Sequence, residues 1–270
     1  MSAFRDKSVI ITGASSGLGA ALALQLARGG ARLTLFSPER DRQREVADLC
    51  EEAGGRALAV IGDVTSPADC ESMTEQAVSH FGSVDFLVAN AGISMWASFP
   101  EIKDLDIIRR LIEVNYLGAV NCVHHALPHL RRSRGMIVAI TSIQGKIGVP
   151  MHTGYVASKH ALQGFCEALR MELEDSGVDV LTVLPHWLRG TELRKHALGK
   201  DGRELGTSSR KHSRESVSIE AACEAILVAM RKRRRELVIP WKLKLLLGLN
   251  LFCPGMAESI ITAAMKKQDR

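Results

Sequence analysis

Residues 8–19 read SVIITGASSGLG, and this stretch decides the fold. Its first part, SVIIT, is a short apolar and β-branched run, which is typical of a strand buried on both faces. Glycines follow at positions 13, 17 and 19, where the chain would leave the strand and start a helix. Glycine allows a tight turn and a close approach to a ligand, and a helix amino terminus offers unpaired N–H groups to an anion. The stretch predicts a strand–loop–helix unit that binds a dinucleotide, with a simple packing turn as the alternative.

Similar apolar runs recur along the chain, with helical stretches between them. They are ARLTLF (31–36), ALAVIG (57–62), VDFLVA (84–89), GMIVAIT (135–141), DVLTVL (179–184) and ELVIP (236–240). This alternation predicts an α/β, doubly wound, mostly parallel (Rossmann-type) sheet of about seven strands with helices on both faces. Because such sheets bind ligands beyond the carboxyl ends of their strands, the glycine turn favours the dinucleotide over the packing alternative.

The 270 residues contain no repeat or linker, so we expect one domain, 1–270. Residues 186–216 are polar and basic with weak periodicity, and we interpret them as a substrate lid, since long irregular loops in compact domains are commonly functional. Residues 241–270 form a carboxyl-terminal tail that begins with the apolar WKLKLLLGLNLF. We expect this tail to pack against the substrate pocket or a second subunit, and peripheral contact with a membrane is the less favoured alternative.

The composition argues against several other classes of protein. The net charge is +5, but the basic residues do not alternate with aromatic ones, so no nucleic-acid partner is expected. The six cysteines form no close pair, and His124, His125 and His129 lack the glutamate of zinc-binding helices, so no metal is expected. The amino terminus runs directly into a strand, and no apolar stretch is long enough to span a bilayer. A cytoplasmic location is therefore expected.

Tyr155 and Lys159 lie four residues apart, which places them on one face of a helix. A free tyrosine has a pKa of about 10, and a nearby cation favours its phenolate and so lowers that pKa. Ser142 directly follows the strand 135–141, at the rim where the ligand crevice is expected. These three side chains predict an acid/base site at this edge of the sheet.

Together these motifs resemble the short-chain dehydrogenase/reductase superfamily over about residues 5–240. The stretch SIQGKIGVPM (142–151), followed by TGYVASKHALQGF, resembles most the hydroxysteroid 11-beta dehydrogenase and ketosphinganine reductase branches. The resemblance implies an NAD(P)-dependent oxidoreductase that interconverts a carbonyl and a secondary alcohol. It implies that Tyr155 is the general acid/base and that Lys159 lowers its pKa and holds the nicotinamide ribose. By the same resemblance Ser142 polarises the carbonyl, and Asn115 supports a proton relay to the lysine.

The resemblance also implies the contacts of the cofactor. Asn90, Ala91 and Gly92 match the family's Asn-Asn-Ala-Gly element, with Ala89 in place of the first asparagine. His186 stands where the family usually has glycine. The expected cofactor contacts are Gly13, Ser15, Ser16, Gly17, Leu18, Gly19, Ser37, Arg40, Asp63, Val64, Asn90, Ala91, Gly92, Tyr155, Lys159, Pro185 and Thr191.

The end of the second strand bears on the choice between NADP and NAD. NAD enzymes place a carboxylate about 20 residues beyond the glycines, whereas Ser37 stands there in this chain. Arg40 and Arg42 follow and suit a 2′-phosphate. Glu39 lies at about the spacing that NAD requires, but if Ser37 caps a helix that begins at Pro38, Glu39 points along the start of that helix. NADP is therefore favoured, and NAD is the alternative.

The loops expected at the substrate pocket are apolar, which favours a small lipophilic ketone or alcohol. The expected substrate contacts are Ser142, Trp96, Ile143, Met151 and Trp187. The lid holds eight Lys/Arg against four Asp/Glu, so a ketone on an acyl thioester is an alternative substrate. A dinucleotide-sensing regulatory protein is an alternative of another class, but it would need the glycine loop without the four catalytic residues. The resemblance implies a homodimer or homotetramer.

Overall fold

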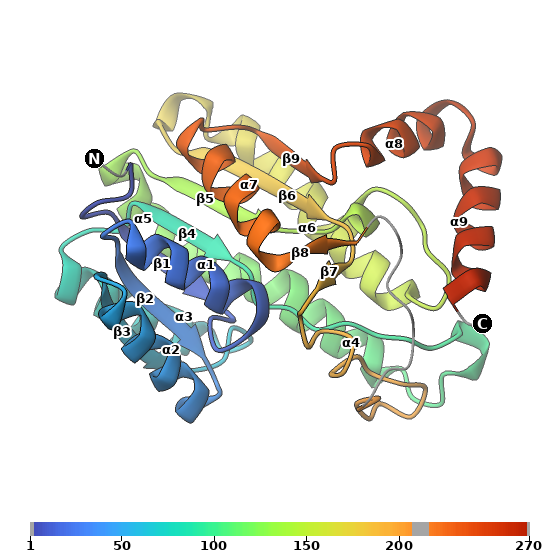
Figure 1. The fold of residues 1–270 in the computed structure, drawn as a ribbon, viewed down its shortest axis with the longest axis horizontal. Coiled ribbons are helices and arrows are strands. Elements are labelled where there is room, and N and C mark those ends of the chain that lie inside the picture. Colours follow the sequence, from blue (N-terminus) through green and yellow to red (C-terminus); the bar gives the residue numbers. More distant parts are fainter. Residues whose placement is uncertain (1–2, 207–215, 269–270) are drawn as a thin grey trace.

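The computed structural model describes residues 3–206 and 216–268. Its centre is a parallel sheet in the order β3-β2-β1-β4-β5-β6-β9 (Figure 1). The strands are β1 (Ser8–Thr12), β2 (Arg32–Ser37), β3 (Arg56–Ile61), β4 (Phe86–Ala89), β5 (Met136–Ile140), β6 (Asp179–Pro185) and β9 (Glu236–Ile239). This seven-stranded sheet confirms the predicted fold class. β1 lies between β2 and β4, so the chain reverses its direction of travel across the sheet there, and a crevice forms at such a reversal.

Helices cover both faces of the sheet because successive strand residues point to opposite sides. In β1, Val9 and Ile11 pack with α1 (Gly17–Arg28), α2 (Arg40–Glu52) and α7 (Ile219–Arg231). Ile10 faces the other way, toward α3 (Pro67–Phe81), α5 (Gly118–Ser133) and α6 (Thr153–Glu172). All five residues of β1 are buried, as the unbroken apolar run predicts.

Shorter elements shape the carboxyl edge of the sheet. α4 (Asp106–Ile112) continues into a π-helical turn, η2 (Glu113–Leu117), and then into α5. Single turns of 3₁₀ helix occur at η1 (Phe99–Glu101), η3 (Ile143–Gly145) and η4 (Glu174–Ser176). In the lid, β7 (Leu188–Arg189) pairs with β8 (Val217–Ser218), which follows the lid. The backbone of Leu198 bonds to Ser94 and Trp96. Residues 207–215 of the predicted lid lie outside the described residues.

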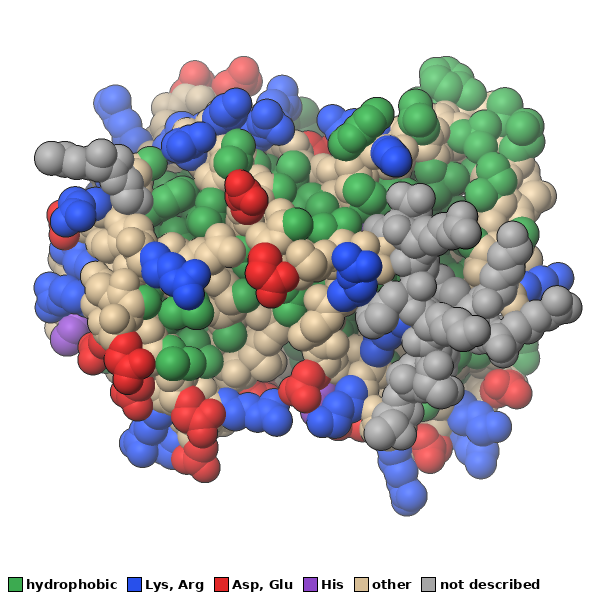
Figure 2. All heavy atoms as spheres, viewed as in Figure 1, with side chains coloured by type: hydrophobic (Ala, Val, Ile, Leu, Met, Phe, Trp, Pro, Cys, Tyr) green, Lys and Arg blue, Asp and Glu red, His purple; other side chains and the backbone are tan. Residues whose placement is uncertain are grey.

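The tail forms two helices, α8 (Leu243–Phe252) and α9 (Pro254–Gln268), at one end of the molecule. Ile261 and Met265 of α9 are buried against Ile143 and Ile147, in the loop that follows β5. The outer face is exposed and apolar, and Figure 2 shows hydrophobic side chains gathered over these two helices. No helix within residues 3–206 and 216–268 is long and apolar enough to cross a membrane.

Candidate active site

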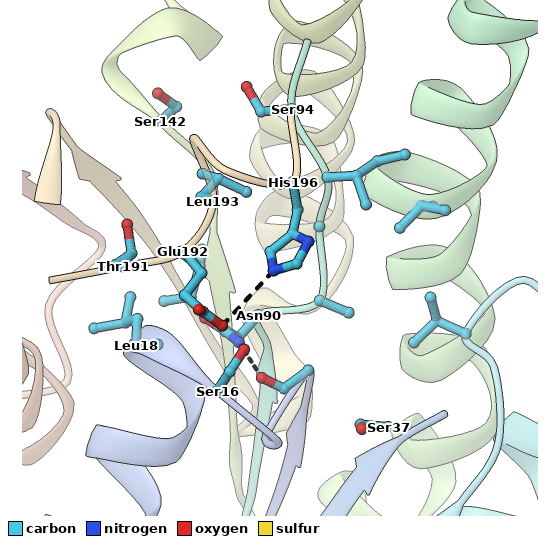
Figure 3. A pocket seen from close by; sticks show the side chains of 18 of the residues that line it. Ser16, Leu18, Ser37, Asn90, Ser94, Ser142, Thr191, Glu192, Leu193 and His196 are labelled. Atoms are coloured by element: carbon cyan, nitrogen blue, oxygen red, sulfur yellow. Dashed lines mark hydrogen bonds and ion pairs between the residues drawn. The ribbon is translucent and has the colours of Figure 1, made fainter. Parts of the chain in front are cut away.

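A cavity of about 830 Å³ opens beyond the carboxyl ends of the central strands. Gly13 follows β1, Asn90 follows β4, Ser142 follows β5 and His186 follows β6, and all four line the cavity. Side chains of the lid, among them Glu192 and His196, point into the same space (Figure 3). The cavity thus lies where a doubly wound sheet binds its ligand.

The glycine loop is held in its turn by close contacts. Gly13 has φ +61, and a Cβ there would lie 2.9 Å from the Cα of Ala91. A Cβ on Gly19 would lie 2.2 Å from the carbonyl oxygen of Gly13. Asn90 Nδ2 donates to the carbonyls of Thr12 (2.9 Å) and Gly13 (3.1 Å), and so fastens the loop after β4 to the glycine loop. The lack of space for a Cβ atom therefore favours glycine at positions 13 and 19.

Tyr155, Lys159 and Ser142 meet in the cavity, as their spacing predicts. Tyr155 and Lys159 lie in the first two turns of α6, and all three side chains are buried. Ser142 lies close enough to the hydroxyl group of Tyr155 to lower the pKa of Tyr155. The Nζ of Lys159 lies 5.8 Å from the centre of the Tyr155 ring and donates to the carbonyl of Ile140 at 2.9 Å. A phenol, a hydroxyl and an ammonium therefore converge at the end of β5.

Burial dominates the electrostatics of this group. It raises the pKa of Tyr155 to about 12, although the hydrogen bond from Ser142 lowers it in part. Burial also lowers the pKa of Lys159 to about 8. The expected lowering of the tyrosine pKa by Lys159 is not seen here, because desolvation of the phenolate outweighs other effects. Tyr155 is thus a neutral phenol at pH 7, which is the form that can donate a proton.

Asn115 lies in the π-helical turn and is fully buried, but it does not line the cavity. Its Oδ1 accepts from the backbone N–H of Ile93 at 2.8 Å. Its Nδ2 donates to the carbonyl of Ile93 and to Ser158 Oγ, both at 2.9 Å. Asn115 therefore joins the loop after β4 to α6 through Ser158, which precedes Lys159. Its place in a proton relay remains a prediction.

The position of Glu39 differs from the one expected from the sequence. α2 begins at Arg40, with Glu39 rather than Ser37 at the cap, so the expected start at Pro38 is wrong. The Glu39 carboxylate accepts hydrogen bonds from Ser37 Oγ (2.7 Å) and Ser15 Oγ (2.8 Å) and lines the cavity. Burial raises its pKa, but these hydrogen bonds and the charge of Arg42 lower it more, so the net pKa falls below its usual value. A carboxylate therefore stands beside the glycine loop.

Most of the predicted site residues line the cavity, but five do not. The five outside the lining are Gly19, Arg40, Trp96, Asn115 and Met151. Arg40 is exposed, while Arg42 lines the cavity and forms an ion pair with Glu192 at 3.0 Å. Trp96 packs edge-on against His152, with ring centres 4.9 Å apart.

Sequence reasoning missed Glu192, Arg194 and His196 as lining residues. The basic composition of the lid was the available signal, but a segment without periodicity gives no side-chain direction. In the part of the chain that the structure describes, no group of three His, Cys, Asp or Glu is arranged to hold a metal ion.

Comparison with known proteins identifies the family. The family model of the short chain dehydrogenases matches residues 7–201. The chain belongs to the short-chain dehydrogenases. Like the other members of this family, it is an oxidoreductase that acts on CH–OH groups. Members of the family bind NAD(P) and act on small molecules.

Named relatives support the hydroxysteroid 11-beta dehydrogenase branch for this short-chain dehydrogenase. It is 35% identical over 257 residues to 11-beta-hydroxysteroid dehydrogenase-like 4A of Arabidopsis thaliana, an alignment that covers 94% of this chain and 83% of the relative. It is 33% identical over 267 residues to dehydrogenase/reductase SDR family member 7B of Rattus norvegicus, covering 96% and 78%. The alcohol dehydrogenase of Thermococcus sibiricus, solved with 5-hydroxy-NADP, superposes with a TM-score of 0.72 at 26% identity, covering 86% and 95%.

Proposed function

We propose that this short-chain dehydrogenase interconverts a ketone and a secondary alcohol with Tyr155 as the general acid/base. The observation that carries the proposal is that Tyr155, Ser142 and Lys159 are buried together in the cavity at the end of β5. In reduction, the phenol of Tyr155 donates its proton to the substrate oxygen, and Ser142 orients that oxygen by a hydrogen bond. The buried ammonium of Lys159 favours the phenolate left behind. In oxidation, the same phenolate takes the proton from the alcohol.

Tyr155, Ser142 and Lys159 cannot supply or accept the hydride that the reaction transfers. A nicotinamide supplies or accepts it when bound, and the glycine loop and the amino terminus of α1 fit the pyrophosphate of such a cofactor. Glu39 supports NAD as the preferred form, because an ionised carboxylate at the ribose end accepts hydrogen bonds from ribose hydroxyls and repels a 2′-phosphate. This reverses the preference for NADP, which depended on Glu39 pointing away from the site.

The walls of the cavity support a lipophilic substrate. Apolar side chains from three loops face it, among them Ile93, Ile143, Leu188 and Leu193. Apolar walls with a few convergent polar groups are typical of sites for hydrophobic small molecules. We also propose that the protein forms a homodimer or homotetramer.

Hydride transfer is the test. The protein is incubated with NADH deuterated at the transferring position and with a panel of lipophilic ketones, and the products are examined by mass spectrometry. We expect one deuterium on the carbinol carbon of the product alcohol. Oxidation of NADH without a deuterated alcohol, or binding of NADH without any turnover across the panel, would contradict the proposed reaction.

A further inference from the structure

Arg194 lies in the lid and lines the cavity. Its guanidinium stacks on the indole of Trp187, with the Cζ atom 4.3 Å from the ring centre. Both terminal nitrogens are buried and have no hydrogen-bond partner among the residues that the structure describes. Burial lowers the pKa of Arg194, but an arginine keeps its charge in proteins. The cavity therefore contains a cation with unused donors.

Two acidic side chains in the described part of the lid, Glu192 and Glu204, pair with other cations. Glu192 pairs with Arg42 at 3.0 Å and with Lys195 at 3.2 Å. Glu204 pairs with His196 at 2.8 Å. Within residues 3–206 and 216–268, Arg194 forms no ion pair with any of them. A buried charge without a partner costs free energy, and a partner that arrives from solution recovers that cost.

The surroundings of Arg194 place it on the substrate side of the cavity. Trp187 packs against His152 with ring centres 5.4 Å apart, and His152 packs against Tyr155 at 6.2 Å. The series Arg194, Trp187, His152 and Tyr155 thus runs from the cation to the acid/base through ring contacts. The glycine loop and the amino terminus of α1, which fit the cofactor phosphates, follow β1 instead.

We propose that Arg194 binds a carboxylate of the substrate, so that the enzyme acts on lipophilic oxo acids and the corresponding hydroxy acids. This inference rests on the proposed function, since it takes Tyr155 as the point where the carbonyl reacts. The planar guanidinium donates two parallel hydrogen bonds to a carboxylate, the geometry for which arginine is suited. The apolar walls hold the chain between the carboxylate and the carbonyl.

Binding of two probes of equal length tests the inference. Decanoate and decanamide are titrated by calorimetry into the protein saturated with NADH. Because a charge-assisted hydrogen bond discriminates by about 10- to 100-fold, decanoate should bind at least tenfold more tightly than decanamide. Arg194→Met should remove that difference, and Arg194→Lys should keep part of it. Arg203→Met, which changes an exposed arginine of the same lid, should leave it unchanged.

Three results would overturn the inference. The first is equal binding of the two probes, or no binding of either, by the unaltered protein. The second is a preference for decanoate that survives in Arg194→Met. The third is an Arg194→Met protein that binds NADH more than tenfold more weakly but is correctly folded by circular dichroism, which would assign Arg194 to the cofactor.

Failure of the proposed function can be distinguished from failure of this inference. Its failure appears as absent hydride transfer, whereas binding of decanoate does not depend on turnover.

Discussion

The carboxylate of Glu39 accepts a hydrogen bond of 2.8 Å from the hydroxyl of Ser15, and so joins the residue after β2 to the loop after β1. This contact fixes a negative charge beside the glycine loop, where the proposed function places the ribose of the cofactor. Ser37 donates to the same carboxylate at 2.7 Å.

Replacing this charge should change the preference between cofactors. Glu39→Gln keeps the shape of the side chain but removes the repulsion of a 2′-phosphate. We expect the ratio of the Kd for NADPH to the Kd for NADH to fall about tenfold, a moderate factor because the site is open to solvent. Fluorescence titration of both cofactors measures the ratio. An unchanged ratio, or tighter binding of NADPH by the unaltered protein, would refute the role given to Glu39.

Lys159 should make the stability of the protein depend on pH. Its pKa is about 8 in the folded protein against an ordinary value of 10.5. Below pH 8 both states carry the proton, so the folded state bears the full cost of burying the charge. Between pH 8 and 10.5 the folded state has lost the proton and the unfolded state has kept it, so stability rises with pH relative to a neutral variant.

Lys159→Met should therefore be more stable than the unaltered protein by about 3 kcal/mol at pH 7, since each pKa unit is worth about 1.4 kcal/mol. The advantage should shrink as the pH approaches 10. Urea unfolding at pH 7, 9 and 10 measures it, and Lys232→Met, at an exposed position, is the control. A difference that stays constant with pH would show that the burial of the ammonium is not the cause.

Two helical glycines offer a matched pair for the glycine loop. A Cβ on Gly19 in α1 would overlap the carbonyl of Gly13, whereas a Cβ on Gly164 in α6 would meet nothing within 4 Å. Gly19→Ala should weaken NADH binding at least tenfold and lower the Tm. Gly164→Ala should raise stability by about 0.5–1 kcal/mol, as alanine does in an open helical position. Similar effects of the two substitutions would mean that the close packing of Gly19 does not maintain the loop.

The sequence allowed the sheet and the centre of the site to be predicted because both depend on local patterns. Buried parallel strands require unbroken apolar runs such as 8–12, and these runs coincide with the strands to within two residues at either end. Ser142, Tyr155 and Lys159 also belong to short motifs, and the order of the strands brings the motifs to one edge of the sheet. Local spacing therefore determines the reacting groups.

The start of α2 and the position of Arg194 depend instead on individual side-chain contacts. Ser37 Oγ bonds to the backbone N–H of Glu39 as well as to its carboxylate, and this turn competes with a helix that would begin at Pro38. The guanidinium of Arg194 stacks on the indole of Trp187, a side-chain contact within the irregular lid. Neither arrangement has a period or a spacing that could be read from the chain.

The most direct test of the central claim uses the only two tyrosines of the chain, Tyr116 and Tyr155. Tyr116 packs against Phe165 with ring centres 6.1 Å apart and serves as the matched control. The measurement is kcat for ketone reduction by Tyr155→Phe and Tyr116→Phe, with the Kd for NADH measured alongside. We predict that Tyr155→Phe lowers kcat at least 100-fold with an unchanged Kd, and that Tyr116→Phe retains activity. Substantial turnover by Tyr155→Phe would contradict the account.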